Sequence, residues 1–197
     1  MTDRELYRYE MNQEELITWN AVRRRILSDC KTLPCREEFE EWIVLQLKEK
    51  NWEHAVGYSN EVGYYFIEAG ERSALVIHCQ TLEEEEFRWF MLKRITKHIG
   101  QRLELKHRET EAKKWRYVTD DLSAGCPMIW KENRNWIYDT REDTRKYWFE
   151  YMLQSLNAIF GKERVEPMVA EYTDAMNLWF EEAHWRFDWA RMEFVEN

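Results

Sequence analysis

The chain has 197 residues, 44% hydrophobic and 34% charged, a balance typical of one small domain with a compact core and a charged surface. Its formal net charge of −9 disfavours binding to nucleic acid and anionic lipid, and favours a basic protein partner. No stretch approaches the roughly 18 apolar residues of a membrane span, and Met1–Leu16 contains no apolar signal segment. We therefore expect a cytoplasmic protein with no membrane partner.

The glycine, proline, cysteine and tryptophan contents further limit the fold and the possible sites. The 6 Gly and 3 Pro favour helices over a many-stranded β architecture. The four cysteines lack the paired spacing of a zinc knuckle, and the Cys30–Cys35 separation is a weak signal for zinc or for a disulfide, so we expect reduced thiols. The 11 Trp are too many for a chain of this size to bury completely, so we expect some at a surface for a partner.

The first part of the chain, residues 1–52, predicts a pair of helices. Asn12 followed by Glu15 is a helix-capping pattern, and Pro34 ends the first helix. The buried stripe of the first helix is predicted to contain Leu16, Trp19, Val22 and Ile26, and that of the second Phe39, Trp42, Ile43, Gln46 and Leu47.

Residues 53–80 change from helical to strand periodicity. "HAVGYS", "GYYFIEA" and "SALVIHC" are short β-prone runs, and the last two flank a tight-turn candidate, "GER". The pattern predicts a small antiparallel meander. Such a sheet is marginal alone and needs a helix packed over it.

The second half predicts helices again. Thr81 and Glu84 form a capping box at the start of a long helix over residues 81–118, with Gly100 as a kink or a close-packing point. A loop follows over 119–138, and residues 139–197 are predicted to be a helical hairpin that turns at Gly161, a residue suited to the left-handed position after a helix. The predicted fold is therefore α+β and mostly α, with a small antiparallel β-meander packed against a bundle of about five helices in one domain, 1–197.

Two Glu-x-x-His pairs, Glu104 with His107 and Glu181 with His184, have the spacing of ligands in carboxylate-bridged metal bundles. Such ligands must face the bundle core. Glu181, however, lies about 200° around the helix from Trp179, which belongs to the apolar stripe. We therefore expect no metal, no cofactor and no catalytic residue, and a helical metalloenzyme stays as an alternative.

A basic stretch between Lys93 and Arg116 has nine Lys or Arg against three Glu, a local charge of +6. Alone, it suits nucleic acid. Cations also gather at a helix C-terminus because of the helix dipole, and the whole chain is acidic, so a nucleic-acid-linked regulator is a weaker alternative.

Two acidic groups are candidates for binding a basic protein. On the expected last helix, Trp185 and Trp189 are one turn apart, beside Glu181, Glu182 and Asp188. If exposed, these indoles suit a hot spot with an acidic rim; otherwise they cover a neighbouring element. The second group opens the long helix and consists of Glu83, Glu84, Glu85 and Glu86.

Four segments occur in an order and spacing that resemble a known family. They are "GYSN" (Gly57–Asn60), "YYFIEAGE" (Tyr64–Glu71), the helix Glu85–Arg108 and "DTRKYWFEYMLQSL" (Asp143–Leu156). Together they resemble the immunity proteins of bacterial polymorphic-toxin systems, immunity protein family sixty-three. The resemblance implies a cytoplasmic, non-catalytic α+β protein that binds and neutralises a cognate toxin domain. It implies no particular binding residue and no oligomeric state.

Overall fold

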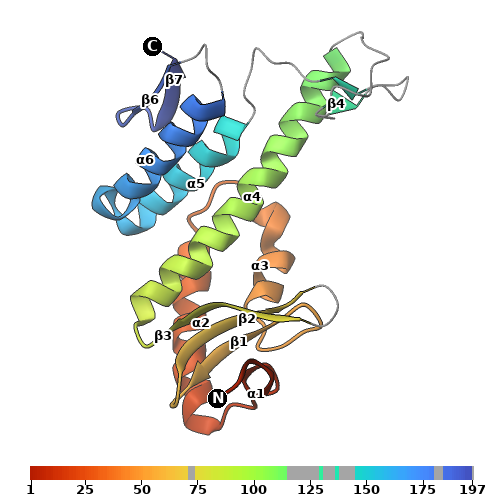
Figure 1. Cartoon of the computed structure of the whole chain (residues 1–197), viewed down its shortest axis with the longest axis vertical. Coiled ribbons are helices and arrows are strands. Elements are labelled where there is room, and N and C mark those ends of the chain that lie inside the picture. The colour runs from red at the N-terminus through yellow and green to blue at the C-terminus, as the bar shows by residue number, and fades with distance from the viewer. Residues whose placement is uncertain (71–73, 115–128, 131–135, 138–144, 180–183, 197) are drawn as a thin grey trace. The chain divides into compact units, whose positions relative to one another are not determined.

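The computed structural model describes residues 1–70, 74–114, 129–130, 136–137, 145–179 and 184–196 (Figure 1). Where the sequence predicted one domain, the chain divides into two compact units, Met1–Ile95 and Thr96–Asn197. The predicted fold class, α+β and mostly α, is confirmed. None of the described helices has the length and apolarity needed to cross a membrane.

The sheet of the first unit is the expected antiparallel meander. Its strands β1 (His54–Ser59), β2 (Gly63–Ala69) and β3 (Leu75–Thr81) are joined in chain order, so β2 is central and β3 is an edge. Gly63, at φ +79°, closes the β1–β2 turn in the left-handed conformation that glycine adopts without strain. A register shift between Phe66 and Ile67 leaves His78 as an extra residue on β3.

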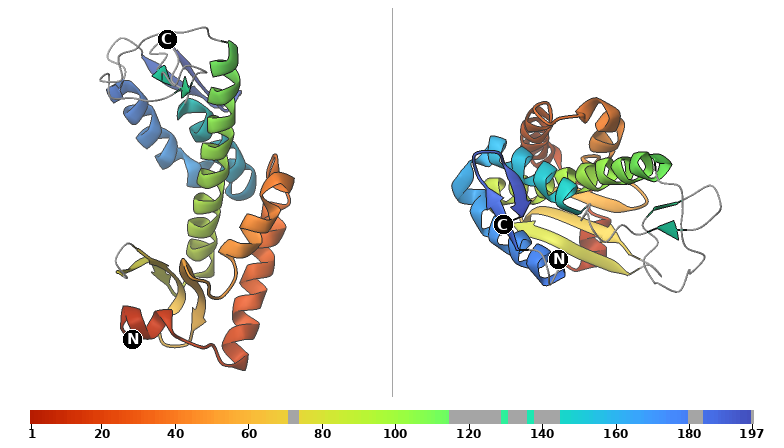
Figure 2. Two further views of the ribbon diagram at one scale, coloured as in Figure 1. Left: turned by 90° about the vertical axis from the view of Figure 1, so that its right-hand side faces the viewer. Right: turned by 90° about the horizontal axis from the view of Figure 1, so that it is seen from above.

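Helices cover both faces of this sheet (Figure 2). A short helix, α1 (Asp3–Tyr7), places Leu6 against Ala55, Tyr65 and Ile67 on one face. The sequence had not predicted α1. On the other face, α2 (Gln13–Cys30) and the start of α4 (Glu84–Lys114) form the core, in which Phe87 contacts Trp19 edge-on at 6.0 Å between ring centroids.

The helix pair expected over residues 1–52 is present, with α3 (Glu40–Gln46) preceded by a 3-10 turn, η1 (Arg36–Phe39). The capping box of Asn12 and Glu15 is confirmed at the start of α2. In α2, the predicted stripe residues Trp19, Val22 and Ile26 are buried. Leu16 is exposed, and Glu15 is buried at the start of the helix in its place. The reason is that three donors, the amides of Asn12 and Asn60 and the Tyr9 hydroxyl, hydrogen-bond the buried carboxylate of Glu15 and compensate for its burial.

In the second unit, α5 (Arg145–Phe160) and α6 (Lys162–Trp179) form the predicted antiparallel pair. Gly161 lies between them at φ +82°, as expected. Gly100 is a close-packing point, since an added Cβ would lie 2.9 Å from the carbonyl oxygen of Trp148. Two short paired strands, β4 (Ile129–Trp130) and β5 (Trp136–Ile137), interrupt the predicted loop 119–138, whose other residues lie outside the described ones.

The prediction of a helix reaching residue 197 is wrong. After α6 ends at Trp179, the chain forms a β-hairpin of β6 (Trp185–Asp188) and β7 (Glu193–Glu196). Phe187 and Phe194 face each other across the hairpin at 5.0 Å between centroids, and Phe194 also meets the ring of Phe149 on α5. Trp185, Phe187 and Phe194 therefore share one face of the hairpin with strand periodicity, opposite Arg186, Asp188 and Glu193.

Candidate protein-binding surface

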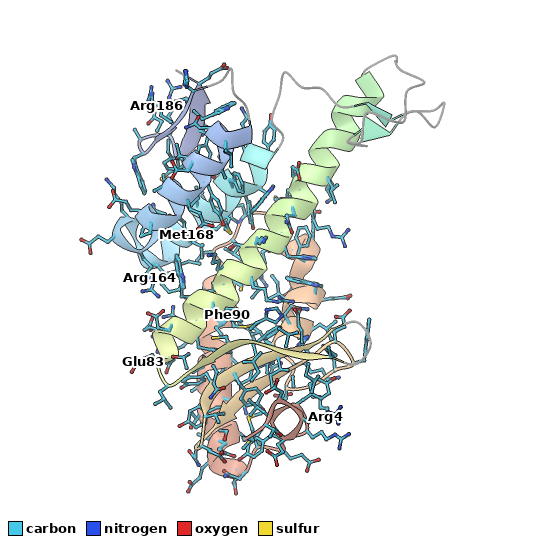
Figure 3. The ribbon with its side chains drawn as sticks, in the orientation of Figure 1. Arg4, Glu83, Phe90, Arg164, Met168 and Arg186 are labelled. Carbon is cyan, nitrogen blue, oxygen red and sulfur yellow. The ribbon has the colours of Figure 1, made fainter. Side chains whose placement is uncertain are left out.

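The acidic group Glu83–Glu86 is partly used inside the first unit. Arg25 of α2 forms ion pairs with Glu84 and Glu85, the latter at 3.0 Å. Arg88, which is buried, bridges Glu85 and Asp29 at 2.5 and 2.6 Å. Glu84 and Glu85 thus tie α4 to α2, whereas Glu83 is exposed at the start of α4 (Figure 3).

Three candidates of the last segment, Trp185, Asp188 and Trp189, lie in the C-terminal hairpin. Glu181 and Glu182 are outside the described residues. Asn177 of α6 holds the backbone of Trp185, donating to its carbonyl at 3.0 Å and accepting from its amide at 2.6 Å. Asp188 accepts from two amides of the hairpin turn, and Trp189 packs edge-on against Phe187. These side chains hold the hairpin together, so Trp185 and Trp189 are half-buried and not the exposed helical pair that the spacing suggested.

Only His184 of the second Glu-x-x-His pair belongs to the described residues. His184 is exposed and directly precedes β6, beyond the end of α6, and Glu181 lies outside the described residues. Glu104 is buried on α4, while the side chain of His107 is outside the described part. Within the described ranges, no three His, Cys, Asp or Glu residues gather as metal ligands would.

Two cations of the basic stretch are engaged in packing. Arg94 pairs with Glu68 and lies over the ring of Phe66 at 4.6 Å, and Lys97 lies over Trp148 at 5.6 Å. Cations held in this way contribute to packing on aromatic rings and are less available to phosphate. The buried histidine His54 stacks on the same Phe66 ring, and burial together with the nearby Arg94 charge lowers its pKa.

A different surface has the features of a binding site. Trp52 is 82% exposed, the highest value among the exposed large hydrophobic side chains of the described residues. It follows α3, which turns Val44 and Leu45 to solvent on the side opposite Ile43 and Leu47. We call Val44, Leu45 and Trp52, with the exposed Glu37 and Glu41, the α3–Trp52 surface.

The turn that carries Trp52 is fixed by hydrogen bonds. The side-chain oxygen of Asn51 accepts from the amides of Glu53 and His54, at 2.7 and 2.8 Å. The Asn51 amide donates to the carbonyl of His54 at 2.9 Å, and Tyr7 of the α1 segment donates its hydroxyl to the Asn51 carbonyl at 3.1 Å. Trp52 thus projects from a rigid support, which lowers the entropy cost of using it in an interface.

Charge on this unit favours a basic partner. Residues 1–95 carry six of the nine excess negative charges of the chain. Exposed carboxylates at Glu37 and Glu41 precede Val44 and Leu45 on η1 and α3, while Glu40 is paired with Arg36 at 2.6 Å. In protein interfaces, exposed carboxylates speed association with a basic partner, and an exposed aromatic side chain can act as the anchor that holds the complex.

Sequence reasoning missed this surface for identifiable reasons. Trp52 stands in a polar stretch, "KEKNWEH", with no periodic apolar neighbour. That isolation was the available signal, since an indole that belongs to no stripe has no predicted place in the core. Val44 and Leu45 escape notice because they directly follow Ile43 in an apolar run.

No family model, curated protein or solved structure matches this chain. The resemblance to immunity proteins therefore remains a prediction. Its motif residues serve the scaffold: Tyr65, Phe66 and Ile67 are buried in β2, and Gly57 leaves no room for a Cβ between Met11 and the Tyr65 hydroxyl. The two motifs of residues 57–71 therefore maintain the sheet.

Proposed function

We propose that the protein is a cytoplasmic immunity protein that binds a cognate bacterial toxin domain and neutralises it without catalysis of its own. One observation carries the proposal: a nearly fully exposed indole, Trp52, on a turn held by hydrogen bonds. Tryptophan is among the residues most enriched at the centres of protein interfaces. The order of the four family-like segments supplies the identity of the partner class.

In the proposed complex, the Trp52 indole fills an apolar pocket of the toxin domain. Val44 and Leu45 extend the apolar contact, and the carboxylates of Glu37 and Glu41 attract a basic surface around that pocket. Inhibition follows if the contacted face of the toxin contains its active site, because the bound protein then excludes substrate.

The test uses the C-terminal domain of the protein encoded by the gene immediately upstream, where we expect the toxin. We expect it to co-purify with the wild-type chain and to lose toxicity on co-expression. Trp52→Ala removes the anchor and should raise Kd about 30-fold, the equivalent of a 2 kcal/mol hot spot. Ile17→Ala is the matched control, since Ile17 is 63% exposed on α2 and lies outside the α3–Trp52 surface.

Charge reversal separates steering from anchoring. Glu37→Lys with Glu41→Lys should slow association at low salt and have little effect once salt screens the charges. Full-strength binding by Trp52→Ala would remove the α3–Trp52 surface from the proposal. Absence of any complex and of any protection would remove the immunity function itself.

A further inference from the structure

The two edges of the sheet in the first unit are protected unequally. The edge of β1 is occupied: the Val56 amide donates to the carbonyl of Glu49 at 2.9 Å, and the Tyr58 amide points to the sulfur of Met11 at 3.4 Å. Helix α1 contacts β3, and Leu75 and Ile77 pack against the cluster of Leu6, but the described residues of α1 form no backbone hydrogen bond with the β3 edge. Among the described residues of this unit, the strand Leu75–Thr81 makes no backbone hydrogen bond beyond its ladder with β2.

The observed bonds identify which amides of β3 point outward. Because the amides of Val56 and Tyr58 point away from β2, alternate residues of β2 face β1, and the Ala69 amide accordingly donates back to Glu53 at 2.7 Å. Phe66 and Glu68 of β2 therefore face β3. Their partners Cys79 and Val76 face β2, which leaves the N–H and C=O groups of Leu75, Ile77 and Gln80 at the open edge.

The side chains of β3 do not discourage pairing. Natural edge strands are commonly blocked by lysine, by another charge or by proline, and residues 75–81 contain none of these. The extra residue His78 is the one protective feature, and its imidazole turns back onto Glu68, with Nε2 2.7 Å from the carboxylate. Val76 is 45% exposed, and Leu82, directly after the strand, is 73% exposed.

We infer that the β3 edge is a second binding surface, which accepts an extended polypeptide segment as an added antiparallel strand. Charge and apolarity define that segment. Its first residues lie beside Leu82 and the exposed Glu83 and are basic, and its later residues lie beside Leu75–Ile77 and are apolar. The surface is distinct from the α3–Trp52 surface, so the inference does not depend on the toxin.

The probe is a fluorescein-labelled peptide with two lysines followed by alternating threonine and valine. Hydrogen exchange of the full-length chain should show fast exchange at Leu75, Ile77 and Gln80 and slow exchange at Val76 and Cys79. Peptide at about 1 mM, about ten times an expected Kd of about 0.1 mM, should slow the three outward amides about tenfold. A peptide with two glutamates in place of the lysines, and one with alternate amides methylated, should bind less well.

Two variants test the edge directly. Gln80→Pro removes one outward N–H, a change tolerated at strand edges, and should weaken binding about tenfold at an unchanged Tm. Val76→Lys adds the charge that edge strands commonly carry and should also weaken peptide binding. It provides the test if Gln80→Pro fails to fold. Ile17→Lys is the control for an added charge elsewhere.

Three results would overturn the inference. One is slow exchange of the outward amides in the free chain. Another is binding that survives both Gln80→Pro and Val76→Lys. The third is the absence of added protection with the lysine peptide.

Discussion

Glu15 offers the sharpest test of how this fold is held together. Its carboxylate is 1% exposed and has three hydrogen-bond donors, the amides of Asn12 and Asn60 at 3.0 and 2.8 Å and the Tyr9 hydroxyl, whose single proton is shared between the two oxygens at 2.8 Å from each. Burial alone raises the pKa of this group. The backbone hydrogen bonds from Asn60 and Asn12 and that from Tyr9 outweigh it and lower the pKa below 4.5. The ionised form therefore joins the start of α2 to the β1–β2 turn.

Glu15→Gln preserves the shape and removes one acceptor. The new NH₂ group must face the amide of either Asn12 or Asn60, because each carboxylate oxygen accepts one of them. One buried N–H then lacks a partner, at about 1–3 kcal/mol, and the remaining bonds lose their charge assistance. We expect a loss of that size, measured by urea unfolding followed by circular dichroism and tryptophan fluorescence. Glu14→Gln, on the exposed neighbour in the same turn, should change stability little.

The same substitution predicts a pH dependence. A carboxyl whose folded-state pKa lies below its unfolded value contributes stability above the unfolded pKa and loses it as pH falls through the folded pKa. The stability difference between wild type and Glu15→Gln should therefore be constant above about pH 4.5 and shrink in more acidic solution. A variant as stable as wild type at pH 7, or a difference that persists unchanged to pH 2, would refute this account.

Three further substitutions test other parts of the fold. Gly161→Ala should cost about 1–2 kcal/mol from its left-handed backbone alone, and Gly63→Ala should cost more because its Cβ would also collide with a backbone carbonyl; comparison of their urea midpoints is the check. Asn177→Ala removes both bonds to the Trp185 backbone and should lower stability by about 1–3 kcal/mol, with faster hydrogen exchange confined to the C-terminal hairpin. Burial raises the pKa of Glu150 despite its bond from a β7 amide, so its contribution is present below its unfolded pKa and lost as pH rises through the folded value. Glu150→Gln should therefore gain in Tm relative to wild type between pH 4 and pH 7, and an unchanged difference would contradict the assignment.

Short sequence patterns predicted the structure correctly where each pattern is compatible with one local conformation. Asn12 with Glu15 allowed a capping box, and Gly161 allowed a left-handed turn between two apolar stripes; both are present. The C-terminal segment had two solutions. Trp185 and Trp189 fit a helical period, while Trp185 and Phe187 fit a strand period, and Asn177 favours the strand by binding the Trp185 backbone from another element.

The binding surfaces were the least predictable part. Exposure is a property of the assembled unit, because it depends on which neighbours arrive from distant parts of the chain. The isolated position of Trp52 was visible in the sequence, but the bond from Tyr7 that helps to hold its turn joins residues 44 positions apart. The open edge of β3 likewise became apparent only once residues 49–51 were found along β1 and nothing comparable was found along β3 in the described part of the unit.

The sequence by itself determined the fold class, the start of α2, the turn at Gly161 and the acidity that favours a basic partner, because these follow from short-range stereochemistry and from charge counts. Tertiary structure alone decided which carboxylates are consumed in ion pairs, that the last segment is a hairpin, and which indole faces solvent. The physical reason is that burial and pairing are set by contacts between residues far apart in the chain, and these outweigh local preference wherever a segment has two possible periodicities.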